Sequence, residues 1–278
     1  MKRSITSALA LAISQACLAD GSPWLTEPET MQLVVSQVQQ SADEFYKANS
    51  TTQVDKLEQK TTWLGLSYGL DYDLAVDFKS GYSSNEGNSV STESGITDST
   101  VGVSWRLVDE FISYSYVPST VLRAAATFQG DYDTGEINAI GDGADSIEVS
   151  LILGRFLNPW LAVSSELGYR KRNSDVPDDA FYKLGAYVLP SPQVSVSLNY
   201  SVVDAQGGLD IGEAGFVNSE DGTVNFHKLE EDSSLVDLGI SFNVLPELNL
   251  SFNAGQVVNG KNTTKSDVYA LTVGYTLP

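Results

Sequence analysis

The sequence predicts an all-β protein: an antiparallel transmembrane β-barrel of about twelve strands, with short periplasmic turns and long extracellular loops. Three observations predict it. Apolar and polar residues alternate along many segments, the connections are alternately short and long, and Tyr and Trp gather near the segment ends. A chain of 278 residues, 42% of them hydrophobic, is long enough for one large all-β domain.

The clearest alternation is VSVSLNYSV, residues 194–202. Successive strand side chains point to opposite faces, so Val194 and Leu198 share one face while Ser195 and Ser197 share the other. In a soluble sandwich the apolar face would be the core. In a transmembrane barrel that face contacts lipid and the polar face lines a lumen.

Segments of this kind predict the strands in order. They lie near 30–41, 58–70, 72–83, 97–108, 120–130, 146–156, 161–173, 179–189, 193–204, 233–244, 247–258 and 266–277. The first alternates least regularly. An even number of strands returns both chain ends to the periplasmic side.

The connections sort by length. From the second connection on, every other one is short: GLDYD, FLNPWL, LPSPQ and VLPEL. The others are more polar, and the long ones cover 84–96, 131–145 and 205–232. The turn at 109–119 is the exception, because it belongs by its position to the short connections but is longer than they are. Short turns on one rim and long loops on the other are typical of outer-membrane barrels.

Charged residues within the polar faces favour a lumen over a solvated outer surface. We expect these residues to serve as selectivity groups or lumen ion pairs: Arg106, Arg123, Glu148, Glu166, Arg170 and Lys183. Aromatic residues near strand ends suit the two membrane interfaces: Tyr68, Tyr82, Trp105, Trp160, Tyr169, Tyr182, Tyr200, Tyr269 and Tyr275.

Glycines also fall on the inward faces: Gly65, Gly81, Gly102, Gly168, Gly185, Gly239, Gly255 and Gly274. They predict either open lumen volume or local curvature of the barrel wall. Eight-stranded barrels fill with side chains and sixteen-stranded ones hold an aqueous channel, so about twelve strands leave both an open and a filled lumen possible.

Residues 1–19 predict a cleaved signal peptide, with Lys2 and Arg3 before a short apolar stretch and Ala19 at the cleavage site. A lipoprotein acylated at Cys17 is the alternative. Residues 20–278 then form a single barrel domain, located in a bacterial outer membrane. The final segment DVYALTVGYTLP alternates as expected of a strand read by the barrel-assembly machinery, although it ends in Leu277-Pro278 rather than an aromatic residue.

The formal net charge of −20 excludes nucleic acid as a partner, because phosphates require a basic surface. The acidic loops predict an external mouth that attracts cations and shares divalent ions with lipopolysaccharide. Asp131, Asp133, Asp142 and Asp145 are weak calcium candidates, since Gly135 occupies the third ligand position of an EF-hand spacing. A solvated acidic hairpin is the alternative reading. One histidine and one cysteine exclude a zinc site, and no cofactor is expected.

The only histidine, His227, could act in a lipid hydrolase if a serine nucleophile lay beside it. Ser219 and Ser233 lie in the same region, but neither has a motif around it. A solvated loop histidine is the simpler interpretation, so we do not expect an enzyme.

Several runs resemble a group of outer-membrane β-barrel proteins labelled as transporters and associated with a phenol-degradation MetA pathway. These runs are WRLVDEF, LRAAATFQGDYDTGEINAIGDGADSIEVSLILGRFL, GYRKRNSDVPDDAFYKLGAYVL and SPWLTEPETMQLVVSQVQQSADEFY. The resemblance implies the fold and the compartment, and more loosely a transport role; it carries no catalytic signature.

The expected function is a passive channel or transporter for small solutes, aromatic or hydrophobic solutes among them. Two alternatives remain open: a plugged structural or surface-binding barrel that acts through its acidic loops, and an outer-membrane lipid hydrolase. Conductance, loop deletion and a hydrolysis assay distinguish the three.

Overall fold

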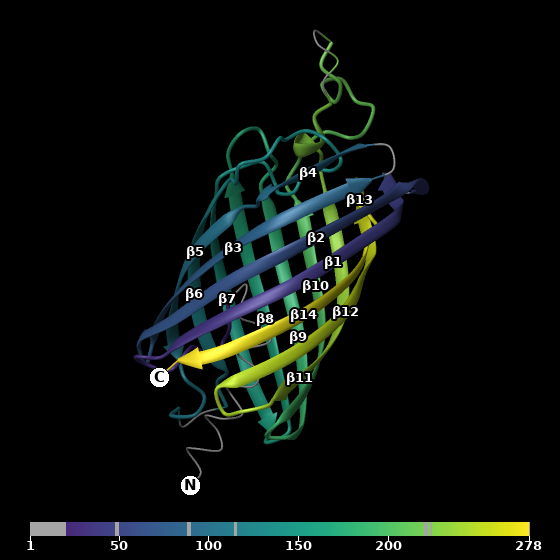
Figure 1. Cartoon of the computed structure of the whole chain (residues 1–278). Coiled ribbons are helices and arrows are strands. Elements are labelled where there is room, and N and C mark those ends of the chain that lie inside the picture. Colours follow the sequence, from purple (N-terminus) through teal and green to yellow (C-terminus); the bar gives the residue numbers. More distant parts are fainter. Residues whose placement is uncertain are drawn as a thin grey trace.

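The computed structural model describes residues 21–47, 50–87, 90–113, 116–219, 222 and 224–277, and these residues form a closed β-barrel (Figure 1). The strands are β1 (Met31–Lys47), β2 (Ser50–Asp71), β3 (Leu74–Gly87), β4 (Val90–Ile96), β5 (Ser99–Val108), β6 (Ser119–Phe128), β7 (Ser146–Asn158), β8 (Leu161–Arg172), β9 (Asp179–Ser191), β10 (Val194–Ala205), β11 (Asp232–Asn243), β12 (Leu248–Lys261), β13 (Thr263–Thr264) and β14 (Asp267–Leu277).

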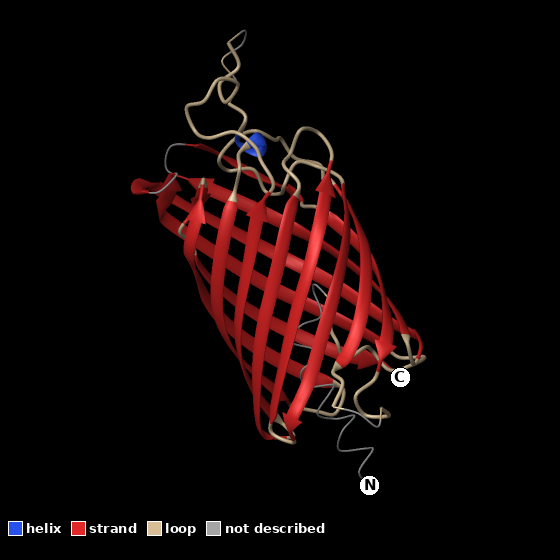
Figure 2. Ribbon diagram, turned by 180° about the vertical axis from the view of Figure 1, so that it is seen from behind, coloured by secondary structure: helices blue, strands red, loops and turns tan. Residues whose placement is uncertain are grey.

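Twelve of these strands build the wall, and each pairs antiparallel with its neighbours. β1 closes the barrel because it pairs with β2 on one side and with β14 on the other. The remaining two are short additions: β4 pairs only with the upper part of β3, and the two-residue β13 pairs with the end of β1. The strands run at a steep tilt to the barrel axis, as closure of a sheet requires (Figures 1 and 2).

The predicted fold class and the order of the strands are confirmed. Met31 of β1 lies opposite Leu277 of β14, so the first strand begins and the last strand ends at the same rim, which we call the periplasmic rim. The predicted signal peptide and Pro278 lie outside the described residues.

The connection predicted at 84–96 is wrong in part, because most of it is strand. β3 continues to Gly87, and β4 returns against it with Ser84 opposite Ser94 and Asn85 opposite Glu93. A polar sequence can form this hairpin because it stands at the loop end of the barrel, where backbone pairing rather than apolar burial holds it. The other long connections leave the same rim, and the one helical element in the described residues, η1 (Phe226–Lys228), lies among them (Figure 2).

The apolar face points outward and the polar face inward. In β10, Ser195 and Ser197 are 4% and 5% exposed, whereas Leu198 on the opposite face is 53% exposed. Outward aromatic residues stand near both rims, with Tyr68 and Tyr275 towards the periplasmic one and Tyr82 near the other. The predicted aromatic positions therefore match two interfacial girdles. Among the described residues, no helix has the length and apolar character to cross a membrane.

Candidate functional site

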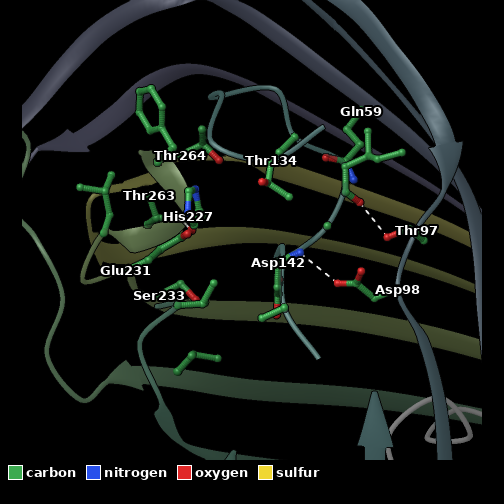
Figure 3. A pocket seen from close by; sticks show the side chains of 18 of the residues that line it. Gln59, Thr97, Asp98, Thr134, Asp142, His227, Glu231, Ser233, Thr263 and Thr264 are labelled. Atoms are coloured by element: carbon green, nitrogen blue, oxygen red, sulfur yellow. Dashed lines mark hydrogen bonds between the residues drawn. The ribbon is translucent and has the colours of Figure 1, made fainter. Parts of the chain in front are cut away.

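A cavity of about 620 Å³ occupies the part of the lumen nearest the long loops (Figure 3). Side chains from most strands line it, and polar ones prevail. Gln59 of β2, Thr127 of β6 and Ser233 of β11 project into it, while Phe45 and Trp63 add aromatic surface. Strands converge on this space because alternate residues of every strand point inward. The cavity is a space inside the barrel that a small solute could enter.

The loop 129–145 folds over this cavity and is held by Asp98, which lies between β4 and β5 (Figure 3). The Oδ1 atom of Asp98 accepts hydrogen bonds from the Tyr132 hydroxyl at 2.6 Å and from the Gly130 N–H at 3.0 Å. Its Oδ2 atom accepts one from the Asp142 N–H at 2.9 Å. Burial, and then the neighbouring Asp98, raise the pKa of Tyr132, so its hydroxyl remains a hydrogen-bond donor.

Replacement of Asp98 by Asn is expected to release this loop. An amide has a single acceptor oxygen, so the Asn NH₂ group would face one of the three donors, at a cost of about 1–3 kcal/mol. Limited proteolysis should then cut within 130–145, and single-channel recordings should become noisier. Glu93→Gln is the matched control, because Glu93 accepts one N–H, that of Asp133, and a Gln carbonyl can replace it. Equal protection of both variants would contradict the anchoring role.

A network of ion pairs runs along the lumen wall and lines part of the cavity. Arg123 of β6, 2% exposed, bonds Asp77 of β3 at 2.7 Å and Glu148 of β7 at 2.9 Å. Glu148 also accepts two hydrogen bonds from Arg170 of β8, at 3.1 and 3.0 Å. Arg170 in turn lies 3.6 Å from the buried Asp179. Four strands and the start of a fifth are thereby joined by one continuous chain of charges.

The network reaches the loop through Arg172. Its Nη2 atom bonds Asp142 at 2.9 Å, and its Nη1 atom pairs with Asp179. Asp142 is half-exposed, and the desolvation that its surroundings impose opposes ionisation, but Arg172 and Arg170 outweigh this effect and lower the pKa of its carboxyl. The loop 129–145 is therefore tied to the wall by charge as well as by Asp98.

Three of the six candidate residues thus lie together in this network: Arg123, Glu148 and Arg170. Glu166 and Lys183 form a separate lumen pair at 3.5 Å, on β8 and β9. Arg106 lies apart from both, at the periplasmic rim, where it bonds Asp73 at 3.2 Å and Asp109 at 3.4 Å. The sequence did not single out the network members Asp77, Arg172 and Asp179.

Inward glycines mostly provide room for a neighbouring side chain. A Cβ atom at Gly102 would lie 2.5 Å from Arg123 Nη2 and 2.6 Å from the Asp77 carboxylate, so this glycine lets the two groups meet across β5. A Cβ at Gly81 would meet the Trp63 ring at 2.7 Å. The space that these glycines leave is filled, so at these positions the interpretation as open volume is wrong.

The N-terminal segment (21–30) lies inside the periplasmic end of the barrel. Trp24, 3% exposed, packs edge-on against Phe156 at 5.3 Å and Tyr187 at 5.9 Å between ring centroids. A Cβ atom at Gly21 would meet Arg123 at 2.8 Å, so the segment extends up to the ion-pair network. The segment then joins β2, where the Glu29 N–H donates to the Gly69 carbonyl. The segment therefore occupies part of the lumen, a position that the sequence pattern did not predict.

The unusually long periplasmic connection at 109–119 holds this segment. Glu110 accepts a hydrogen bond from Trp24 Nε1 at 3.1 Å and another from the Phe156 N–H at 2.9 Å. Ser119 also donates to Glu110, at 3.4 Å. The length of this connection is therefore explained by its contact with the N-terminal segment, which a turn of few residues could not reach.

His227 lies in η1 at the edge of the cavity, close to Gly135 and Gly143 (Figure 3). Burial, and then the nearby Lys228, lower its pKa. In the described part of the chain no hydrogen bond joins His227 to Ser219 or Ser233, so the arrangement needed for a serine nucleophile does not form there.

The calcium candidates make other contacts. Asp142 pairs with Arg172, and Asp145 accepts the Gln129 N–H at 2.9 Å. Asp133 contributes its N–H to Glu93, and the Asp131 carbonyl packs against Gly95. Within the residues that the structure describes, no group of three or more His, Cys, Asp or Glu side chains is placed to hold a metal ion.

Known proteins share this architecture. An outer membrane channel from Pseudomonas putida F1 superimposes with a TM-score of 0.73 at 14% identity, covering 93% of this chain and 100% of that one. The NanC porin gives a TM-score of 0.52 at 10% identity, over 88% of this chain and 100% of that one. At these identities the likeness establishes the barrel fold. No curated protein matches the sequence. Residues 33–273 match the family described as "Putative MetA-pathway of phenol degradation", and the chain belongs to that family.

Proposed function

We propose that this protein is a passive channel of the outer membrane that lets small solutes diffuse through the barrel lumen. The observation that carries the proposal is the cavity of about 620 Å³, which is lined by inward side chains of the strands and by the loop 129–145. Polar walls favour the passage of water and of solutes that can form hydrogen bonds with the wall. Charged groups in a pore discriminate among ions. A passive channel requires no cofactor and no catalytic group.

The solutes that we propose are small and include aromatic and hydrophobic molecules. Trp63, Phe45 and Ile140 give the cavity apolar surface beside its polar groups. The charge network in the cavity wall would slow larger or fully charged molecules. The acidic loops above would raise the local concentration of cations, an effect that salt weakens.

Liposome swelling tests the proposal. We expect vesicles that contain the folded protein to swell in a pentose, with rates that fall steeply for a disaccharide and a trisaccharide. Heat-modifiable mobility on a gel verifies that the barrel is folded. If folded barrels admit the pentose no faster than protein-free vesicles do, the channel proposal fails.

A second candidate function is a plugged barrel that binds partners through its acidic loops, and the N-terminal segment (21–30) within the lumen favours it. It predicts no swelling in any solute, together with a binding phenotype that disappears when 131–145 is deleted. Lipopolysaccharide bridged by divalent ions is the partner that the loop charge would suit. Delivery by a cleaved signal peptide and insertion by the barrel-assembly machinery belong to both proposals.

A further inference from the structure

A second, smaller cavity of about 160 Å³ lies on the inner wall formed by β14, β1, β2 and β3. Its apolar lining includes Val34 and Val38 of β1, Gly65 of β2 and Ala270 of β14. Strand pairing places these residues together independently of the cavity itself, because Val34 lies opposite Gly65 and Val38 opposite Ala270. We call this cavity the apolar niche.

The niche joins the large cavity at two residues. Trp63 and Lys79 line both cavities, and the Lys79 ammonium lies 4.3 Å from the centroid of the Trp63 ring. The indole rests against Gly81, where a Cβ atom would lie 2.7 Å from it, so the ring is fixed against the wall. Lys79 has a flexible four-carbon stem and lies opposite Gly65, which has no side chain.

The niche has the size and the charge for one class of ligand. Apolar cavities of about 150 Å³ accommodate a single benzene ring. Lys79 is the one charged residue among the described residues that line the niche, and a cation at the entrance favours a carboxylate. An aromatic ring in the niche would also contact the edge of Trp63.

We propose that the apolar niche is a binding subsite for small aromatic carboxylates, with the ring among Val34, Val38 and Ala270 and the carboxylate on Lys79. The subsite deepens the proposed function, since it names a solute class that the lumen would select. The subsite rests on the proposed function only in that solutes must be able to reach the niche. Binding is a separate property from conduction, so a barrel that conducts nothing can still be tested.

Titration calorimetry of the folded barrel in a zwitterionic detergent tests the subsite, with benzoate as the probe. Benzyl alcohol has the ring without the charge, and acetate has the charge without the ring. We expect one benzoate per barrel, bound at least about tenfold more tightly than either comparison molecule, because both the ring and a charge-assisted hydrogen bond contribute.

Substitutions at Lys79 and Gly65 locate the site. Lys79→Met should weaken benzoate binding to the level of benzyl alcohol, whereas Lys183→Met, a lumen lysine paired with Glu166 away from the niche, should leave it unchanged. Gly65→Val should abolish binding of benzoate and benzyl alcohol alike by filling the niche. A Cβ atom there lies 3.7 Å from Val34, an ordinary contact, so Gly65→Ala is the milder variant if Val impairs folding.

Three results would overturn the proposal. They are benzoate binding no tighter than benzyl alcohol, equal losses in the Lys79 and Lys183 variants, and full binding in a folded Gly65→Val barrel. Swelling measurements on the same preparations distinguish this failure from failure of the channel. A barrel that admits the pentose but binds no benzoate keeps the channel and loses the subsite.

Discussion

Deleting residues 21–27 is expected to raise the single-channel conductance several-fold. These residues fill the periplasmic end of the lumen, where Trp24 is held by Phe156, Tyr187 and Glu110. Without them the lumen below the ion-pair network is open to water. Planar-bilayer recording of the shortened barrel beside the full one measures the change, with heat-modifiable mobility as the test of folding.

Single substitutions distinguish an effect of the N-terminal segment from a general loss of barrel structure. Trp24→Ala should produce frequent transitions to a larger conductance, because the segment loses its main buried anchor, 3% exposed. Trp160→Ala is the matched control, since Trp160 is 55% exposed on the outer side of the same rim. An unchanged conductance after deletion of 21–27 would show that the N-terminal segment does not restrict the path.

Replacement of Arg123 by Met should give the largest loss of stability of any single change in the wall. Arg123 is 2% exposed and neutralises both Asp77 and Glu148. Removal of one partner from a buried pair leaves an uncompensated charge and costs about 3–5 kcal/mol. The free energy of unfolding in urea, followed by tryptophan fluorescence in micelles, measures the effect. Ion selectivity should shift towards cations at the same time.

Two comparisons make this result specific. Gly102→Ala should act in the same direction, because its new methyl group would separate Arg123 from Asp77. Arg106→Met should cost less than Arg123→Met, since one of its two carboxylate partners, Asp73, is 59% exposed and such pairs contribute little. Equal stability of the Arg123 and Arg106 variants would contradict the structural role of the network.

Sequence predicted the wall of the barrel well because the wall depends on local rules. The period of two sets the face of each residue, and short turns set the register of each hairpin. Register alone then places Glu148 opposite Arg170 and Glu166 opposite Lys183, so these pairs could have been derived by counting from the turns. The weak alternation at 30–41 did not mislead, because β1 is held from both sides by its neighbours.

The contents of the lumen could not be predicted in the same way. The Arg123–Asp77 pair joins β6 to β3 across the intervening β5, and it depends on the absence of a side chain at Gly102. The alternation of apolar and polar residues does not predict such a contact. The N-terminal segment has no regular pattern, and its position follows from tertiary contacts of Trp24 with β7 and β9. The strand β4 was missed because its backbone pairing at the rim needs no apolar face.

The central claim is that ions and solutes pass through the cavity inside this barrel. The most direct measurement is single-channel current through a Gln59→Cys barrel during addition of a negatively charged methanethiosulfonate reagent. Gln59 lines the cavity, while the adjacent Lys60 is exposed on the outer face and provides the matched control as Lys60→Cys. The account predicts a stepwise loss of current at Gln59→Cys and none at Lys60→Cys. Full current through a Gln59→Cys barrel whose thiol is shown to be modified would contradict it.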